Sequence, residues 1–123
     1  MGFVYLVGNR EHGWFKIGKS ADPTFRIRSI SINCPVELEV ISLTEAAHYS
    51  ELEAFLHARF KAKHLRGEWF QFNTTDIKQY TEEVRAYEEL TPAQRKAARL
   101  SARKKNVEDG IKQGVRTSMK KSA

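Results

Sequence analysis

The aromatic residues and the basic charge of this chain occupy different segments, and this separation limits which part can fold. The 7 Phe, 2 Trp and 4 Tyr all precede residue 88. Residues 1–90 carry 11 Lys/Arg against 13 Asp/Glu, whereas residues 91–123 carry 10 against 2. Large apolar side chains build a core, while runs of like charge stay solvated. We therefore expect one folded domain over residues 1–90 and a basic tail over residues 91–123.

Composition excludes several classes of protein. The chain is 29% charged and 41% hydrophobic, which is typical of a soluble domain and not of a disordered chain. Its single cysteine, Cys34, excludes an intramolecular disulfide framework and a cysteine-rich zinc site. No apolar run approaches the ~20 residues of a membrane span, and no charged leader precedes the apolar N-terminus. We expect a cytoplasmic protein with no membrane partner, and the oligomeric state is left open.

Local patterns predict a β-hairpin followed by a helix in the first third of the chain. Two short apolar runs over residues 3–7 and 14–18, with a glycine-containing loop between them, are typical of a hairpin. Asp22 and Pro23 then provide an N-cap and a first helical turn. This helix is expected to continue to about residue 32.

The remaining elements follow from alternation and helical periodicity. Alternating apolar residues predict a strand over residues 36–43, and the segment over residues 67–72 is expected to be extended. Helices are expected over residues 49–63 and 75–89. The capping-box pattern at Thr91–Gln94 predicts a fourth, basic helix, with fraying or disorder after Asn106.

Side-chain geometry places several polar groups beside one another. If Val4, Leu6, Phe15 and Ile17 pack into the core, strand alternation turns the next residues to the opposite face, namely Tyr5, Lys16 and Gly18. On the predicted helices, some charged residues border an apolar arc and others point to solvent. Those at a border are Arg26, Glu53 and His57, whereas Glu51 is expected to point to solvent.

The ordered set of short motifs resembles the GIY-YIG nuclease superfamily, in its phage- and prophage-associated branch. Val4-Tyr5 is similar to the first motif, with Phe3 in place of its glycine, and Lys16-Ile17-Gly18 is similar to the second, with Lys16 in place of its tyrosine. Three further matches follow at the family's spacings: Arg26, Glu53 and the segment Gly67-Glu68-Trp69-Phe70.

The resemblance implies a fold, an activity and a set of site residues. The implied fold is a small α/β (α+β) domain with a three-stranded antiparallel sheet flanked by helices. The implied activity is hydrolysis of DNA phosphodiester bonds by an endonuclease that uses one divalent metal, Mg²⁺ or Mn²⁺. Glu53 would hold the metal, Arg26 would bind the phosphate, and Tyr5 would orient or deprotonate the water.

Two of these assignments have alternatives. Lys16 either favours the phenolate of Tyr5 through its positive charge or contacts the phosphate directly. His57 is either an accessory base, an outer-shell partner or a half-buried histidine without a catalytic role. The replacement of a motif tyrosine by Lys16 also favours a second function, that of a DNA-binding module with weak or no catalysis.

The basic tail predicts contact with a polyanion. Arg95, Arg99 and Arg103 are spaced by four residues and would form one ridge on a weakly docked helix. The residues predicted to bind DNA phosphates without sequence preference are Lys19, Arg95, Lys96, Arg99, Arg103, Lys104 and Lys105. RNA is an alternative partner, and a solubilising tail or a protein-interaction domain are the alternatives without nucleic acid.

Overall fold

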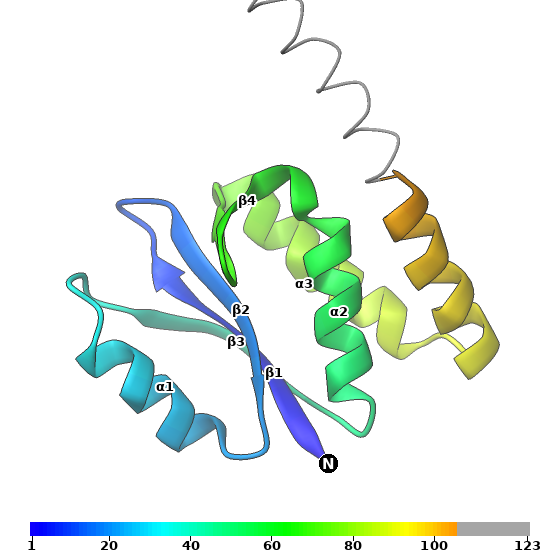
Figure 1. Cartoon of the computed structure of the whole chain (residues 1–123), viewed down its shortest axis with the longest axis horizontal. Helices are drawn as coiled ribbons and strands as arrows, with labels where there is room; N and C mark the ends of the chain where they lie inside the picture. The colour runs from blue at the N-terminus through cyan, green and yellow to red at the C-terminus, as the bar shows by residue number, and fades with distance from the viewer. Residues whose placement is uncertain (106–123) are drawn as a thin grey trace, which may run out of the picture.

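A five-stranded antiparallel sheet forms the centre of the structure, a computed structural model that describes residues 1–105 (Figure 1). The strand order is β3-β1-β2-β5-β4, so β2 is central and the hairpin formed by the last two strands extends one edge. The strands are β1 Gly2–Asn9, β2 Trp14–Ser20, β3 Glu39–Ala46, β4 His64–Arg66 and β5 Trp69–Gln71.

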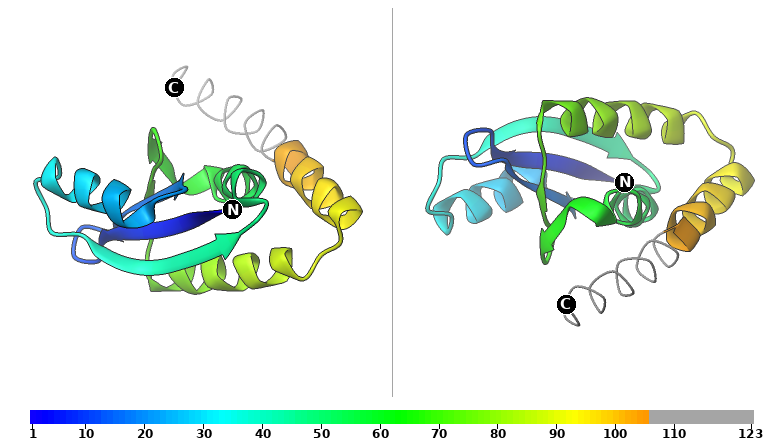
Figure 2. Two further views of the ribbon diagram at one scale, coloured as in Figure 1. Left: turned by 90° about the horizontal axis from the view of Figure 1, so that it is seen from below. Right: turned by 90° about the horizontal axis from the view of Figure 1, so that it is seen from above.

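Helices cover both sides of this sheet, which confirms the α+β class. Helix α1, Pro23–Ile32, and helix α3, Thr74–Glu88, lie on opposite sides of the sheet (Figure 2). Helix α2, Tyr49–Arg59, packs against β1, β2 and α3 and is followed by a 3-10 turn, η1, at Lys61–Lys63. No helix within the described part of the chain is both long and apolar enough to cross a membrane.

The expectation of three strands was wrong because the sheet continues through a second hairpin. Residues 64–66, which follow the expected helix and had no predicted element, form β4, and Gly67 turns the chain into β5 with a φ of 56°. Strands of three residues are too short to produce a periodic signal. The third strand was also misplaced, since residues 36–38 form a loop before β3 begins at Glu39.

The predicted core residues of the first hairpin are confirmed. Val4, Leu6 and Ile17 are fully buried and Phe15 is 1% exposed, all on the face that packs against α2 and α3. The residues between them on β1 belong to the other face, where α1 contacts both β1 and β2. Helix α1 buries none of its own residues completely, although Asp22 caps it as predicted by accepting a hydrogen bond from the Phe25 amide.

The helix over residues 92–105 packs more firmly than its composition predicted. Ala102 is buried in the core cluster and Ala98 packs against it. Glu51 of α2 does not point to solvent as expected, because it forms ion pairs with Arg95 and Arg99. The division between a domain over residues 1–90 and a tail stays a prediction, and the expected fraying after Asn106 lies outside the described residues.

Candidate functional site

The pairing of β1 with β2 builds the floor of the candidate site. Tyr5 lies directly opposite Gly18 in the antiparallel register. A Cβ atom at position 18 would clash with the Tyr5 phenol, so a glycine is required for the ring to lie there. Tyr5 is fully buried, and its hydroxyl makes no fully formed hydrogen bond to a described residue, although the Arg26 guanidinium lies close enough to act on it. A buried hydroxyl with an incomplete hydrogen bond is costly to folding, which makes Tyr5 a candidate for a functional role.

Helix α2 reaches this floor because β2 is only half covered by β5. β5 pairs with β2 at Trp14, Phe15 and Lys16 and extends no further along it. Beyond that point, His57 Nε2 on α2 donates a hydrogen bond to the Ile17 carbonyl oxygen at 2.8 Å. Antiparallel strands leave such edge groups unpaired unless another element covers them. Helix α2 covers this edge and thereby brings Glu53, one turn before His57, to the site.

Glu53 is the carboxylate with the most unusual surroundings in the cluster. Its Oε2 atom is buried and makes no hydrogen bond to any described residue. Burial raises the pKa of Glu53, the charge of Glu68 raises it further, and Lys19 and Lys16 oppose the rise. A carboxylate oxygen that is shielded from solvent and receives no hydrogen bond is available to bind a cation.

Tyr5 is held in its protonated form. Burial raises the pKa of the Tyr5 phenol, the Arg26 guanidinium opposes this, and the charges of Glu68 and Glu53 add to the rise. This rise does not support the alternative in which Lys16 favours a phenolate, and both roles expected for Lys16 stay predictions. The Lys16 ammonium instead forms an ion pair with Glu68, with 3.1 Å between Nζ and Oε2.

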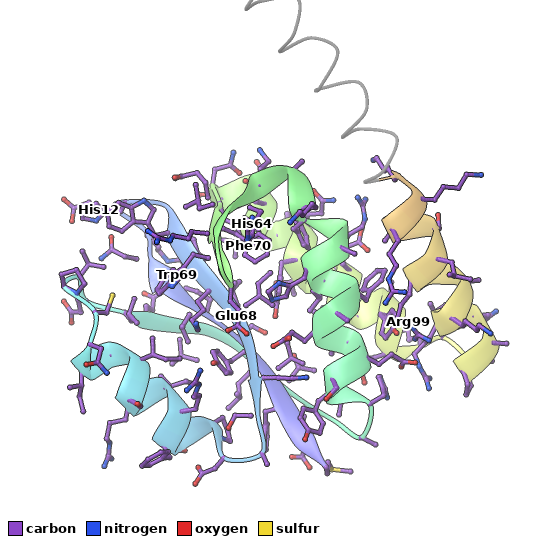
Figure 3. The ribbon with its side chains drawn as sticks, viewed as in Figure 1. His12, His64, Glu68, Trp69, Phe70 and Arg99 are labelled. Atoms are coloured by element: carbon purple, nitrogen blue, oxygen red, sulfur yellow. The ribbon has the colours of Figure 1, made fainter. Side chains whose placement is uncertain are left out.

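Glu68 is a member of the cluster that sequence reasoning missed as a functional residue. Figure 3 shows it in the middle of the molecule, and its carbonyl oxygen accepts a hydrogen bond from the Ile17 amide at 3.1 Å. Its carboxylate charge acts on both Tyr5 and Glu53. The sequence analysis used Glu68 only as part of the segment Gly67-Glu68-Trp69-Phe70, and its carboxylate became informative once the β4–β5 hairpin placed it beside β2.

A second missed residue approaches Glu53 from α3. Tyr80 is fully buried, and its hydroxyl has no hydrogen-bond partner among the described residues. Burial raises the pKa of Tyr80, and the charge of Glu53 raises it further. Helical periodicity predicts only that Tyr80 packs in the core.

His57 is neutral in this setting. Burial lowers the pKa of its imidazole, while the hydrogen bond to Ile17 opposes that change. The ring also packs edge-on against Phe70, with 5.1 Å between ring centroids. The structure thus brings the five residues predicted to be catalytic into one cluster with Glu68, namely Tyr5, Lys16, Arg26, Glu53 and His57.

The residues predicted to bind DNA are placed differently from one another. Lys19 lies at the cluster, where its Nζ donates a hydrogen bond to Ser50 and its charge acts on Glu53. Arg95 and Arg99 face α2 and α3 instead of forming a free ridge, since they bind Glu51, and Arg99 also binds Tyr87. The exposed cations of this helix are Lys96, Arg103, Lys104 and Lys105. Figure 1 shows the helix on the far side of α2 from β2.

The donor set fits a divalent cation that retains most of its water. Within residues 1–105, no group of three or more His, Cys, Asp or Glu side chains forms a protein-only metal cage. Mg²⁺ is commonly bound through one or two carboxylates together with waters and substrate phosphates. Glu53, with its unpaired oxygen, and the neighbouring Glu68 meet that requirement.

The fold defines a class, a small α+β domain. Within that class, the T5orf172 domain model matches residues 2–85, and the chain belongs to this phage-associated family of nuclease-like, DNA-binding domains. This match overturns the expected assignment to the GIY-YIG superfamily. The two short motifs that suggested that superfamily already depart from its pattern at Phe3 and Lys16. No curated protein and no solved structure matches the chain.

Proposed function

We propose that the chain hydrolyses phosphodiester bonds in DNA with a divalent cation, Mg²⁺ or Mn²⁺, bound at Glu53. The observation that carries the proposal is the buried, unpaired Glu53 Oε2 atom, which lies in a cluster with a cationic Arg26 and a protonated Tyr5. Phosphodiester hydrolysis needs charge neutralisation on the phosphoryl oxygens and an oriented water. These three side chains supply both.

The residues have distinct roles in this reaction. When bound, the metal supplies Lewis-acid stabilisation of phosphate charge. Arg26 donates charge-assisted hydrogen bonds to a non-bridging phosphate oxygen. Tyr5 keeps its proton at Oη and donates a hydrogen bond that orients the phosphate or the water. His57 positions α2 through its bond to Ile17, and Lys16 balances the charge of Glu68.

A second candidate is a DNA-binding module without hydrolysis. The ion pair between Lys16 and Glu68 favours it, because an ammonium already neutralises the second carboxylate of the cluster. In that case the cluster would bind a phosphate through Arg26 and Lys19, and the exposed cations of the helix over residues 92–105 would add contacts to other phosphates.

Conversion of supercoiled plasmid by the full chain tests the proposal. With Mg²⁺ or Mn²⁺ the parent is expected to nick or linearise the plasmid, whereas Glu53→Gln loses at least about 100-fold in rate because its metal ligand is gone. Glu82→Gln, an exposed position on α3, is the matched control and retains the parent rate. Cleavage by Glu53→Gln at the parent rate would contradict the proposal. Binding without cleavage by the parent would establish the second candidate.

A further inference from the structure

A groove extends from the candidate site between α1 and the β4–β5 hairpin. It encloses about 770 Å³, a volume in the range of small-ligand sites. We call it the α1 groove and define it by six of its lining residues: Trp14, Lys16, Arg26, Leu65, Arg66 and Trp69. Lys16 and Arg26 belong to the cluster at one end, so a ligand in the groove is continuous with a phosphate bound at Arg26.

The charged side chains that line the groove are all cations, although Lys16 is paired with Glu68, which does not line it. Three of its lining residues are cations, Lys16, Arg26 and Arg66, and none is acidic. This contrasts with residues 1–90 as a whole, where Asp and Glu outnumber Lys and Arg. An apolar lining that also carries cations suits a ligand that joins a flat apolar body to phosphate groups.

Both tryptophans of the chain line this groove. Trp14 is 38% exposed, and its ring stacks against His12 with 4.4 Å between centroids. Trp69 pairs with Lys16 across β2 and β5, and the Lys16 Nζ atom lies 5.7 Å from its ring centroid. Figure 3 shows Trp69 and Phe70 on opposite sides of the hairpin, with only Phe70 directed to the core. Aromatic faces beside cations are the usual platform for stacking nucleic-acid bases.

We propose that the α1 groove binds an unpaired base adjacent to the scissile phosphate. The inference rests on the proposed function, since it takes the phosphate to be bound at Arg26. A base inside an intact duplex is covered on both faces by its neighbours and cannot enter a groove of this kind without leaving the stack. The preferred substrate is therefore DNA with single-stranded, branched or flipped nucleotides, and Trp14 and Trp69 are specificity-determining residues.

Oligonucleotide binding in EDTA tests this inference apart from cleavage. The probes are a single strand of thymidines roughly six nucleotides long, an all-abasic strand with the same phosphates, and a fully paired hairpin duplex. The thymidine strand is expected to bind the full chain at least about tenfold more tightly than the abasic strand. It is also expected to quench intrinsic tryptophan fluorescence more than either comparison probe, because both reporters line the groove.

Two variants show whether the preference for the thymidine strand comes from the α1 groove. Trp14→Ala should weaken binding of the thymidine strand about tenfold and leave the abasic strand unchanged. Phe25→Ala removes an aromatic ring that is 71% exposed on α1 and does not line the groove, so it should leave both affinities unchanged. Equal affinity for the thymidine and abasic strands, or equal quenching by the duplex, would overturn the inference. Either result leaves the plasmid assay intact, and a failure of plasmid cleavage leaves this binding result intact.

Discussion

Two side chains of the cluster carry a cost that a purely structural role does not explain. The Tyr5 hydroxyl and the Glu53 Oε2 atom are both buried without hydrogen-bond partners among the described residues. Removing such a group relieves a desolvation penalty, whereas removing a catalytic group lowers the reaction rate. Stability and activity should therefore respond in opposite directions to substitution at both positions.

Tyr5→Phe separates these two effects at the floor of the site. The variant keeps the ring that fills the space opposite Gly18 and loses only the unpaired hydroxyl. We expect thermal stability equal to or above that of the parent, and plasmid cleavage slower by about 10- to 100-fold because one hydrogen-bond donor to the reacting group is gone. Calorimetry and the plasmid assay are the measurements. A variant that is clearly less stable and fully active would show that the hydroxyl is structural.

The raised pKa of Glu53 predicts a pH-dependent gain in stability for Glu53→Gln. A pKa that is higher in the folded than in the unfolded state favours the protonated form in the fold. The stabilisation of the fold by protonated Glu53 is complete when the pH is below the pKa of Glu53 in the unfolded state. It is lost as the pH rises through the pKa of Glu53 in the folded state. The variant should thus have the higher melting temperature at pH 7, and the difference should vanish below about pH 4.

Melting curves of parent and variant across this pH range measure the effect. Glu82→Gln again serves as the exposed control and should show no such trend. A Glu53→Gln variant that melts below the parent at pH 7 would mean that the charged carboxylate is compensated in the fold, contrary to its surroundings in the structure.

At the scale of elements, the position of α2 depends on an ion-pair network with the helix over residues 92–105. Glu51 accepts from Arg95 Nε at 2.9 Å and also pairs with Arg99. Burial raises the pKa of Glu51, but the hydrogen bond from Arg95 and the charge of Arg99 outweigh this and lower it overall. The network therefore stabilises the fold above the usual pKa of a glutamate and is lost as the pH falls through the lowered value.

Glu51→Ala should release this helix from α2. The loss of a partly buried, charge-assisted network is expected to cost about 1–2 kcal/mol in the free energy of unfolding. It should also speed amide hydrogen exchange over residues 92–105 more than in β1 or β2. Glu82→Ala is the matched acidic control on α3. Unchanged exchange in the helix would show that the packing of Ala98 and Ala102 is sufficient to hold it.

For the whole molecule, we expect the exposed cations beyond α2 to set the salt dependence of DNA binding. Each phosphate neutralised by a protein cation releases counterions, so the affinity falls with salt in proportion to their number. The double variant Lys104→Gln/Lys105→Gln should reduce the slope of log affinity against log salt by roughly 2 units on duplex DNA.

The control is a double variant that removes two positive charges from a different surface. Lys78 and Arg85 lie on α3, across the sheet from α1, and the double variant Lys78→Gln/Arg85→Gln should leave the slope unchanged (Figure 2). Equal slopes for both double variants would show that the end of the helix over residues 92–105 does not contact DNA.

The sequence by itself determined the parts of this protein that depend on neighbouring residues. Alternation in the first hairpin assigned Val4, Leu6, Phe15 and Ile17 to the core and turned Tyr5 and Gly18 to the other face, because adjacent strand residues point to opposite sides. The cap at Asp22 and the capping box at Thr91 followed from the same local logic. Helical periodicity likewise placed Glu53 and His57, both half-buried, beside the buried face of α2, whereas Arg26 is exposed on a helix without a buried residue.

Only the tertiary structure decided which of these edges meet. The uncovered half of β2 was taken by α2, the β4–β5 hairpin brought Glu68 beside Lys16, and Glu51 was enclosed by Arg95 and Arg99. These contacts join residues far apart in the chain, and they depend on which surface is left unpaired once the core has packed. Local periodicity predicts the face of a strand or helix on which a residue lies, but it does not predict which other element covers that face.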